Sequence, residues 1–193
     1  MSLLANNLPD QRLLIGTATS SVSRATLSRS ESYMAPIGFA ANYGIYLSDS
    51  LMLDGGMSLT LDSVEGGIFL LGGSAGLQYH LLGGRPIEYN DLYLDISSYS
   101  KFNILAGIGL SAGSYNFAAY DRASAVSGTI ITPDQKDQQQ GAFFALYTSI
   151  AIDYAQSKSF SPGIKLTFKS AFSDDTSPDL TFMDISLYGA FNL

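Results

Sequence analysis

Cysteine is absent from this chain of 193 residues, so neither a disulfide framework nor a thiolate metal site can form. The single histidine, His80, leaves no histidine-rich metal cluster either. No stretch approaches the run of about 18 apolar residues that a transmembrane helix needs. The opening MSLLANNLPDQ lacks the charged start and apolar centre of a secretory signal. We therefore expect no metal and no cofactor, and an export signal removed before these residues.

Charge is also scarce. Charged residues make up 14% of the chain, against about 25% in an average soluble domain, which is too few to coat a globular surface. Acidic residues outnumber basic ones by 17 to 10, and the net charge is −7. Because nucleic acid calls for a basic surface, this balance argues against such a partner. The 19 glycines, 12 tyrosines and 11 phenylalanines instead favour strands and tight turns.

The stretch FNILAGIGLSA, residues 102–112, alternates with a period of two. Every second residue from Phe102 is apolar, whereas the opposite face is small and mostly polar apart from Leu105. That pattern predicts a β-strand with two different faces. Its length is that of a tilted strand crossing a bilayer.

Similar alternation predicts further strands along a single domain spanning residues 1–193. The expected strands are 12–23, 35–47, 50–61, 67–81, 102–117, 141–156, 160–172 and 180–193. Residues 1–11 are expected to be an N-terminal tail, and the blurred pattern of 12–23 leaves its faces unassigned. The long connection 82–100 contains LYLDI, which could add a strand, so ten strands stay possible. No segment keeps a 3.6-residue period, and we expect no substantial helix.

The charged residues indicate which face points outward. In the seven later strands the apolar faces carry no charge at all. The charged strand residues all lie on the opposite faces: Asp54, Asp153, Lys165, Lys169 and Asp184. An eight-stranded barrel has room for few large side chains inside, so the small, polar faces should line the lumen and the apolar faces should meet lipid. We predict an all-β, closed, antiparallel, up-and-down transmembrane barrel of eight strands.

An unpaired charge in a narrow lumen would cost several kcal/mol, so these five residues should form a lumenal charge network. In an antiparallel hairpin, residues equally far from the centre of the turn lie opposite each other. This rule predicts two cross-strand pairs, Lys169 with Asp184 and Asp153 with Lys165. The network could provide an ion or proton path, but a plug of ion pairs is the simpler interpretation.

Aromatic residues on the apolar faces gather near one rim. If both chain ends lie on the periplasmic side, they form a periplasmic aromatic girdle of Tyr43, Tyr79, Phe102, Tyr154, Phe160 and Phe191. Aromatic side chains are attracted to the membrane interface, although they are also common in strands generally.

Segments such as LAGIGLSAG and the closing strand DISLYGAFNL resemble the small eight-stranded outer-membrane barrels of the OmpA and OmpX type. The resemblance covers residues 12–193 and consists of pattern rather than a signature motif. The family's last strand usually ends in Phe; here Leu193 is last, and Phe191 lies two residues earlier on the same face. The resemblance implies residence in the bacterial outer membrane, with lipid and lipopolysaccharide as neighbours.

From this resemblance we expect a structural or surface-interaction role without enzymatic activity. Any extracellular partner would meet the outward loops 24–32, 116–140 and 173–179, because loops carry recognition on a rigid scaffold. A small pore or a carrier for an apolar ligand is one alternative. A lipid-A-modifying enzyme is another, but His80 points inward and no nucleophile, base and acid converge on it in the sequence.

Overall fold

The computed structural model describes most of the chain, and all of its regular structure is β-strand. The described residues are 11–25, 30–35, 37–61, 69–85, 87–91, 94–98, 100–119, 137–157, 159–172 and 179–193. No helix long and apolar enough to cross a membrane occurs in these ranges.

Within the described residues, nine strands form one closed antiparallel sheet. They are β1 (Gln11–Ala25), β2 (Ser30–Ala35), β3 (Ile37–Tyr46), β4 (Leu51–Leu61), β5 (Phe69–Leu82), β8 (Phe102–Ala119), β9 (Asp137–Tyr154), β10 (Phe160–Ala171) and β11 (Asp179–Asn192). β2 and β3 pair with successive parts of β1 and therefore occupy one position in the wall. β11 pairs with β1 and closes the barrel. The predicted barrel of eight antiparallel positions is confirmed.

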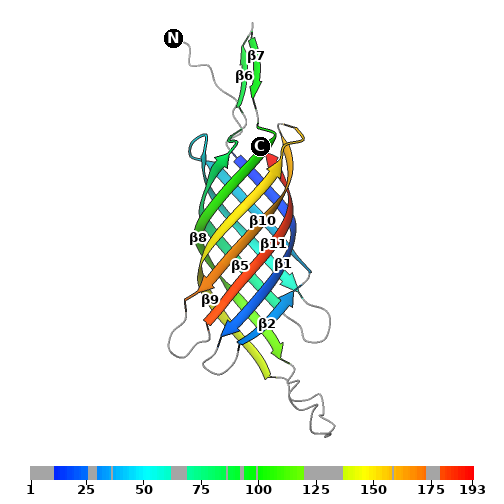
Figure 1. Ribbon diagram of the computed structural model, residues 1–193, viewed down its shortest axis with the longest axis vertical. Helices are drawn as coiled ribbons and strands as arrows, with labels where there is room; N and C mark the ends of the chain where they lie inside the picture. Colours follow the sequence, from blue (N-terminus) through cyan, green and yellow to red (C-terminus); the bar gives the residue numbers. More distant parts are fainter. Residues whose placement is uncertain are drawn as a thin grey trace.

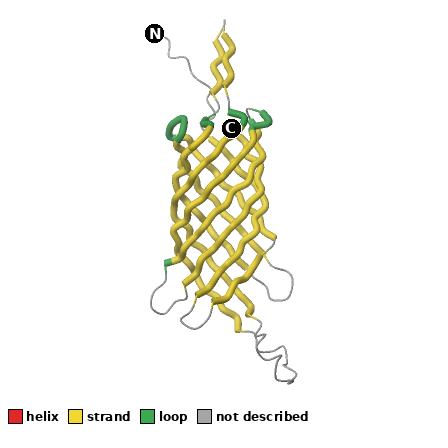
Figure 2. The backbone as a smooth tube through the Cα atoms, in the orientation of Figure 1, coloured by secondary structure: helices red, strands yellow, loops and turns green. Residues whose placement is uncertain are grey.

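The two ends of the barrel differ (Figure 1). One end, called here the turn end, carries the C-terminus and the short connections from β3 to β4 and from β9 to β10. At the opposite end, called the loop end, strands are joined through residues 26–29, 62–68, 120–136 and 173–178, which lie outside the described residues. Figure 2 shows the tilted strands continuing as one lattice between these ends.

The predicted orientation of the two faces is confirmed. Leu146 and Ile185 are 46% and 41% exposed on the exterior, whereas Lys165 and Asp184 are only 7% and 9% exposed in the interior. Large apolar side chains thus cover the outside, and charged ones lie within. The arrangement is the inverse of a soluble barrel, and it matches a barrel whose outer surface meets hydrocarbon.

The structure also assigns the faces of β1, which the sequence left open. Arg12, Leu14 and Ala18 are buried in the lumen, whereas Ile15 and Thr17 are exposed on the exterior. Gln11 belongs to β1 rather than to the N-terminal tail. The pairing of β1 with both β3 and β11 decides these faces.

The connection 82–100 does not add a strand to the barrel. Its described part forms a separate two-stranded sheet, in which β6 (Ile87–Asp91) pairs with β7 (Leu94–Ser98). Figure 1 shows this hairpin standing beyond the turn end. Gly83 leaves β5 with a φ of 84°, a backbone conformation that glycine adopts without steric cost. The ten-stranded alternative is therefore wrong.

Several strands reach further than the sequence suggests. β1 continues to Ala25 and β2 begins at Ser30, inside the predicted loop 24–32. β8 and β9 stay paired as far as Ala119 and Asp137, inside the predicted loop 116–140. Polar composition led to the loop prediction, but the backbone ladder continues through these polar residues. The remainder of these loops lies outside the described residues.

The lumen is less uniformly polar than expected. Towards the loop end it contains a cluster of buried apolar residues formed by Leu70, Phe143, Ala145, Leu180 and Phe182. Towards the turn end it contains a second cluster formed by Leu14, Tyr46, Met52, Leu105, Ala151, Tyr188 and Ala190. The charged residues are thus embedded in a packed interior.

Candidate functional site

The lumenal charge network begins near the turn end, around Asp153 of β9. The guanidinium of Arg12, on β1, forms a buried ion pair with the Asp153 carboxylate. Asn103 Nδ2 donates to Asp153 Oδ1 at 2.8 Å, and the Tyr188 hydroxyl donates to Oδ2 at 3.2 Å. Asp153 is only 1% exposed, so these donors from three other strands replace the water that its charge would otherwise need.

The predicted pair of Asp153 with Lys165 is wrong. Gly163, not Lys165, lies opposite Asp153 in the β9–β10 ladder, and Lys165 lies opposite Ala151. A shift of two residues in an antiparallel ladder keeps a side chain on the same face but changes its neighbour. Lys165 is therefore not paired with Asp153, and its side chain extends across the lumen instead.

A second layer surrounds Asp54 of β4. Lys165 Nζ lies 3.5 Å from Asp54 Oδ2, and β10 is diametrically opposite β4 in the strand order. Gln78 Nε2 donates to Asp54 Oδ2 at 2.5 Å, and the Tyr147 hydroxyl donates to Oδ1 at 3.1 Å. This layer spans the barrel from wall to wall.

The third layer is the pair of Lys169 with Asp184, on the neighbouring strands β10 and β11. Lys169 Nζ lies 2.6 Å from Asp184 Oδ2, and both side chains are about nine-tenths buried. This is the cross-strand pair that the sequence predicts from the equal distances of the two residues from the turn. Three cations and three carboxylates are therefore paired within the described part of the lumen.

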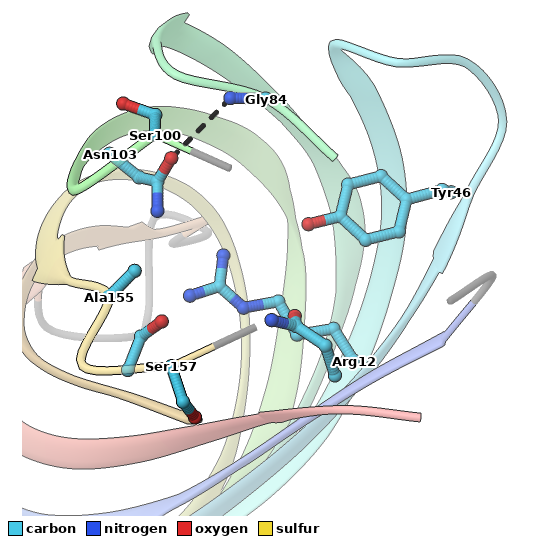
Figure 3. Close-up of a pocket in the computed structure, with 9 residues that line it drawn as sticks. Arg12, Tyr46, Gly84, Ser100, Asn103, Ala155 and Ser157 are labelled. Atoms are coloured by element: carbon cyan, nitrogen blue, oxygen red, sulfur yellow. Dashed lines mark hydrogen bonds between the residues drawn. The ribbon is translucent and has the colours of Figure 1, made fainter. Parts of the chain in front are cut away.

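Small cavities lie between these layers in the part of the lumen that the structure describes. A cavity of about 50 Å³ lies beside Lys165, Lys169 and Asp184 and is lined mainly by hydroxyl, amide and small side chains. Another, of about 10 Å³, lies at the turn end (Figure 3). There the Arg12 side chain extends between Tyr46 and Ala155. Such volumes hold one or a few water molecules.

His80 lies inside the barrel, as its place in the alternation predicts, and is only 4% exposed. Its Nε2 is 3.4 Å from the Tyr46 hydroxyl, and its Nδ1 has no hydrogen-bond partner among the described residues. Within those residues no group of acidic, histidine or cysteine side chains could hold a metal ion.

All six aromatic residues of the predicted girdle lie near the turn end. Phe102 and Tyr154 pair across β8 and β9 with ring centroids 5.1 Å apart, and Phe160 and Phe191 pair at the same distance. Phe160 is half-buried, and the other members are exposed: Tyr43, Tyr79, Phe102, Tyr154 and Phe191.

A second group of exterior aromatics, not anticipated from the sequence, lies nearer the loop end. Phe144 and Phe172 stack with centroids 5.5 Å apart, and Phe69 is also exposed. We call these three residues the loop-end belt. Phe144 precedes Tyr154 by ten residues on β9, which is about 33 Å along a strand. At the usual tilt this gives about 25 Å of height, the thickness of the apolar band of a membrane barrel.

Sequence reasoning missed several members of the charge network. Gln78, Asn103, Tyr147 and Tyr188 already stood on lumenal faces, and their buried polar ends could have marked them as partners. Arg12 could not be found in this way, because the faces of its strand were ambiguous. The cationic partners of Asp54 and Asp153 also lie on strands that are not their neighbours.

These features together define a transmembrane β-barrel. The barrel is closed and antiparallel, its exterior is apolar, and its charges are paired inside. Aromatic residues lie at both ends of an apolar band about 25 Å tall. Solved structures with a similar fold can be compared with this chain. The chain is similar to Ail, the attachment invasion locus protein of Yersinia pestis, with 14% identity, a TM-score of 0.54, and coverage of 94% of this chain and 96% of that one. The chain has the fold of the small eight-stranded outer-membrane barrels of Gram-negative bacteria.

Two further structures agree on the fold. Neisserial surface protein A is 9% identical with a TM-score of 0.59, covering 94% of this chain and 97% of its own. The outer membrane protein OprG of Pseudomonas aeruginosa is 10% identical with a TM-score of 0.51, covering 96% and 97%. No protein-family model matches the chain, and no curated protein matches it. At such low identity the likeness concerns the fold alone.

Proposed function

We propose that this protein is a closed outer-membrane scaffold that presents its loop-end segments to partners outside the cell, without pore or enzymatic activity. The observation that carries the proposal is the length of β8 and β9. Their ladder continues past Phe144 of the loop-end belt to the pair Ala119–Asp137. Seven residues beyond the belt correspond to about 23 Å along the strand, so the described ends of β8 and β9 project beyond the apolar band at the loop end.

The closed lumen supports the same proposal. Two of its ion-pair layers cross the barrel from non-adjacent strands, and the cavities between the layers hold only a few waters. A rigid, filled barrel suits a scaffold better than a channel. An apolar ligand would have to displace charges that are already paired, at a cost of several kcal/mol.

The loop-end sequences indicate the chemistry of the partner. The four segments that join strands at this end, 26–29, 62–68, 120–136 and 173–178, contain six acidic and three basic residues. Ail has been crystallised in complex with the heparin analogue sucrose octasulfate. An acidic surface repels such a polyanion, so we infer that the partner of this protein is basic or neutral.

The orientation can be tested by site-specific labelling, because the chain contains no cysteine. Ser127→Cys places one thiol in the longest loop-end segment, and Ser48→Cys is the matched control at the turn end. A polyethylene-glycol maleimide too large to pass porins should label Ser127→Cys in intact cells and Ser48→Cys only after permeabilisation. Labelling of Ser48→Cys alone in intact cells would reverse the orientation and overturn the proposal.

The role itself can be tested by replacing residues 121–135 with a short glycine-serine turn. Adherence of cells bearing the wild-type protein to a host-cell layer should fall to background with this variant. Heat-modifiable migration on a detergent gel should be unchanged in both, since the barrel ladder stays intact. Equal adherence of both proteins, or steady conductance steps of the wild type in a planar bilayer, would contradict the scaffold role.

A further inference from the structure

One connection at the turn end is longer than the other two and contains the hairpin of β6 and β7. Within the described residues these two strands pair only with each other. Figure 1 shows the hairpin beyond the end of the barrel, away from the wall that meets lipid. The hairpin therefore takes no part in closing the barrel wall.

The base of the hairpin is fixed to the mouth of the barrel. On the side that leads into β6, Arg85 N donates to Asp49 O at 2.9 Å, and the Arg85 guanidinium lies 6.0 Å from the centre of the Tyr46 ring. On the side that follows β7, Ala155 N donates to Lys101 O at 2.8 Å. Because both ends of the connection are held in this way, the hairpin projects from a defined position.

The register of the hairpin separates its residues into two different faces. Opposite residues in an antiparallel pair share a face, and successive residues along a strand alternate between faces. Four of the six positions on one face are apolar: Ile87, Tyr89, Leu94 and Ile96. None of the four positions on the other face is apolar: Glu88, Asn90, Asp95 and Ser97. A two-stranded hairpin is marginally stable in water on its own, so we expect a further segment to complete it.

The charge of the hairpin indicates the chemistry of that segment. Residues 87–98 contain three acidic residues and no basic one. A second copy of the hairpin would bring two such negative charges together, which disfavours association between copies. A basic segment would instead be attracted. If its basic residues alternate with apolar ones, each kind falls on the matching face of the enlarged sheet.

We propose that this hairpin is a docking site for a periplasmic protein, which adds an extended segment of alternating basic and apolar residues to one edge. That edge is unpaired within the described residues. Its main-chain groups provide hydrogen bonds for affinity, and the two different faces select the segment. The periplasmic location of the partner rests on the orientation in the proposed function, whereas the docking itself does not.

The test measures binding of a model segment to the full-length protein in nanodiscs of phosphatidylcholine, a lipid without net charge. The probe is the fluorescent peptide Lys-Val-Lys-Ile-Lys-Val-Lys, followed by fluorescence anisotropy. A scrambled peptide of the same composition, Lys-Lys-Val-Ile-Val-Lys-Lys, keeps the charge but loses the alternation. Salt of about 0.15 M screens charges that are further apart than about 8 Å. The alternating peptide should bind saturably, and the scrambled one should bind at least about fivefold more weakly, because it cannot place both residue types on matching faces.

Two variants with the same change in net charge locate the site. Asp95→Lys turns an attraction on the polar face into a repulsion, so it should weaken binding of the alternating peptide about fivefold. Asp49→Lys is the matched control at an exposed turn-end position outside the hairpin, and it should bind like the wild type. Replacement of residues 87–98 by a short glycine-serine turn should abolish binding while heat-modifiable migration of the barrel is kept.

Several results would overturn the inference. They are absence of saturable binding, equal affinity for the alternating and scrambled peptides, and undiminished binding after replacement of residues 87–98. Self-association of the wild type that this replacement abolishes would assign the hairpin to a second copy instead. If peptide binding fails while Ser127→Cys is still labelled from outside, the proposed function stands and only the docking site fails. Labelling of Ser48→Cys in intact cells would instead remove the periplasmic partner together with the proposed function.

Discussion

Arg12 and Asp153 form an ion pair across the lumen, although their strands β1 and β9 are three positions apart around the barrel. Asp153 also accepts hydrogen bonds from Asn103 and Tyr188. One carboxylate therefore connects four strands, β1, β8, β9 and β11, near the turn end. This contact closes the lumen there and ties together strands that share no ladder.

Replacement of Asp153 by alanine should destabilise the barrel strongly. Arg12 would remain buried without its partner, which typically costs about 3–5 kcal/mol. Urea unfolding in lipid vesicles would measure the loss. The double variant Arg12→Leu with Asp153→Leu should be more stable than Asp153→Ala alone, since it leaves no buried charge. Equal stability of Asp153→Ala and the wild type would contradict the importance of this pair.

The pair of Lys169 with Asp184 allows a test by charge reversal. Lys169→Asp and Asp184→Lys should each destabilise the barrel, because each places like charges 2–3 Å apart in a buried site. The double reversal should recover part of the loss, with a coupling energy of about 0.5–3 kcal/mol. Denaturant midpoints of the four proteins give this energy directly. Strict additivity of the two single effects would mean that the pair contributes nothing specific.

Gly109 should not tolerate a side chain. A Cβ at this lumenal position on β8 would come within 2.6 Å of Gly76 Cα and 2.7 Å of the Tyr147 ring. Gly109→Ala should therefore cost about 1–3 kcal/mol through overpacking. Gly72→Ala is the matched control, because its Cβ would meet nothing closer than 3.6 Å. Refolding yield and unfolding midpoint in vesicles should fall for the first variant and stay near wild type for the second.

A charge on the exterior should reveal the position of the membrane. Ile108 lies midway between the two aromatic ends and is 59% exposed. Ile108→Lys should therefore cost about 2–4 kcal/mol in a bilayer, and Phe102→Lys, at the turn-end rim, only about 0–1 kcal/mol. Equilibrium unfolding from phospholipid vesicles measures both. Equal penalties at the two depths would be incompatible with hydrocarbon around Ile108.

The sequence by itself determined which face points outward in the seven strands that follow β1. Alternation with a period of two places Ile104 and Lys165 on opposite sides of the wall without any knowledge of neighbours, and the number of strands followed from counting such stretches. It also placed Lys169 beside Asp184, because those strands are adjacent and joined by one connection. The blurred alternation around Arg12 marks the limit of this approach, since Leu13 and Leu14 are both apolar and only pairing decides which one enters the lumen.

Only the tertiary structure decided that Arg12 meets Asp153 and that Lys165 meets Asp54. A two-residue shift in the β9–β10 ladder moves Lys165 away from Asp153 without changing its face, so periodicity cannot detect it. Closure of β11 onto β1 then brings Arg12 to Asp153, and the width of the barrel brings Lys165 to Asp54. These contacts join strands that are distant in the sequence, and they depend on how far each strand is staggered against the next around the closed wall. Side-chain alternation fixes a direction within one strand, whereas stagger is a property of all the strands together.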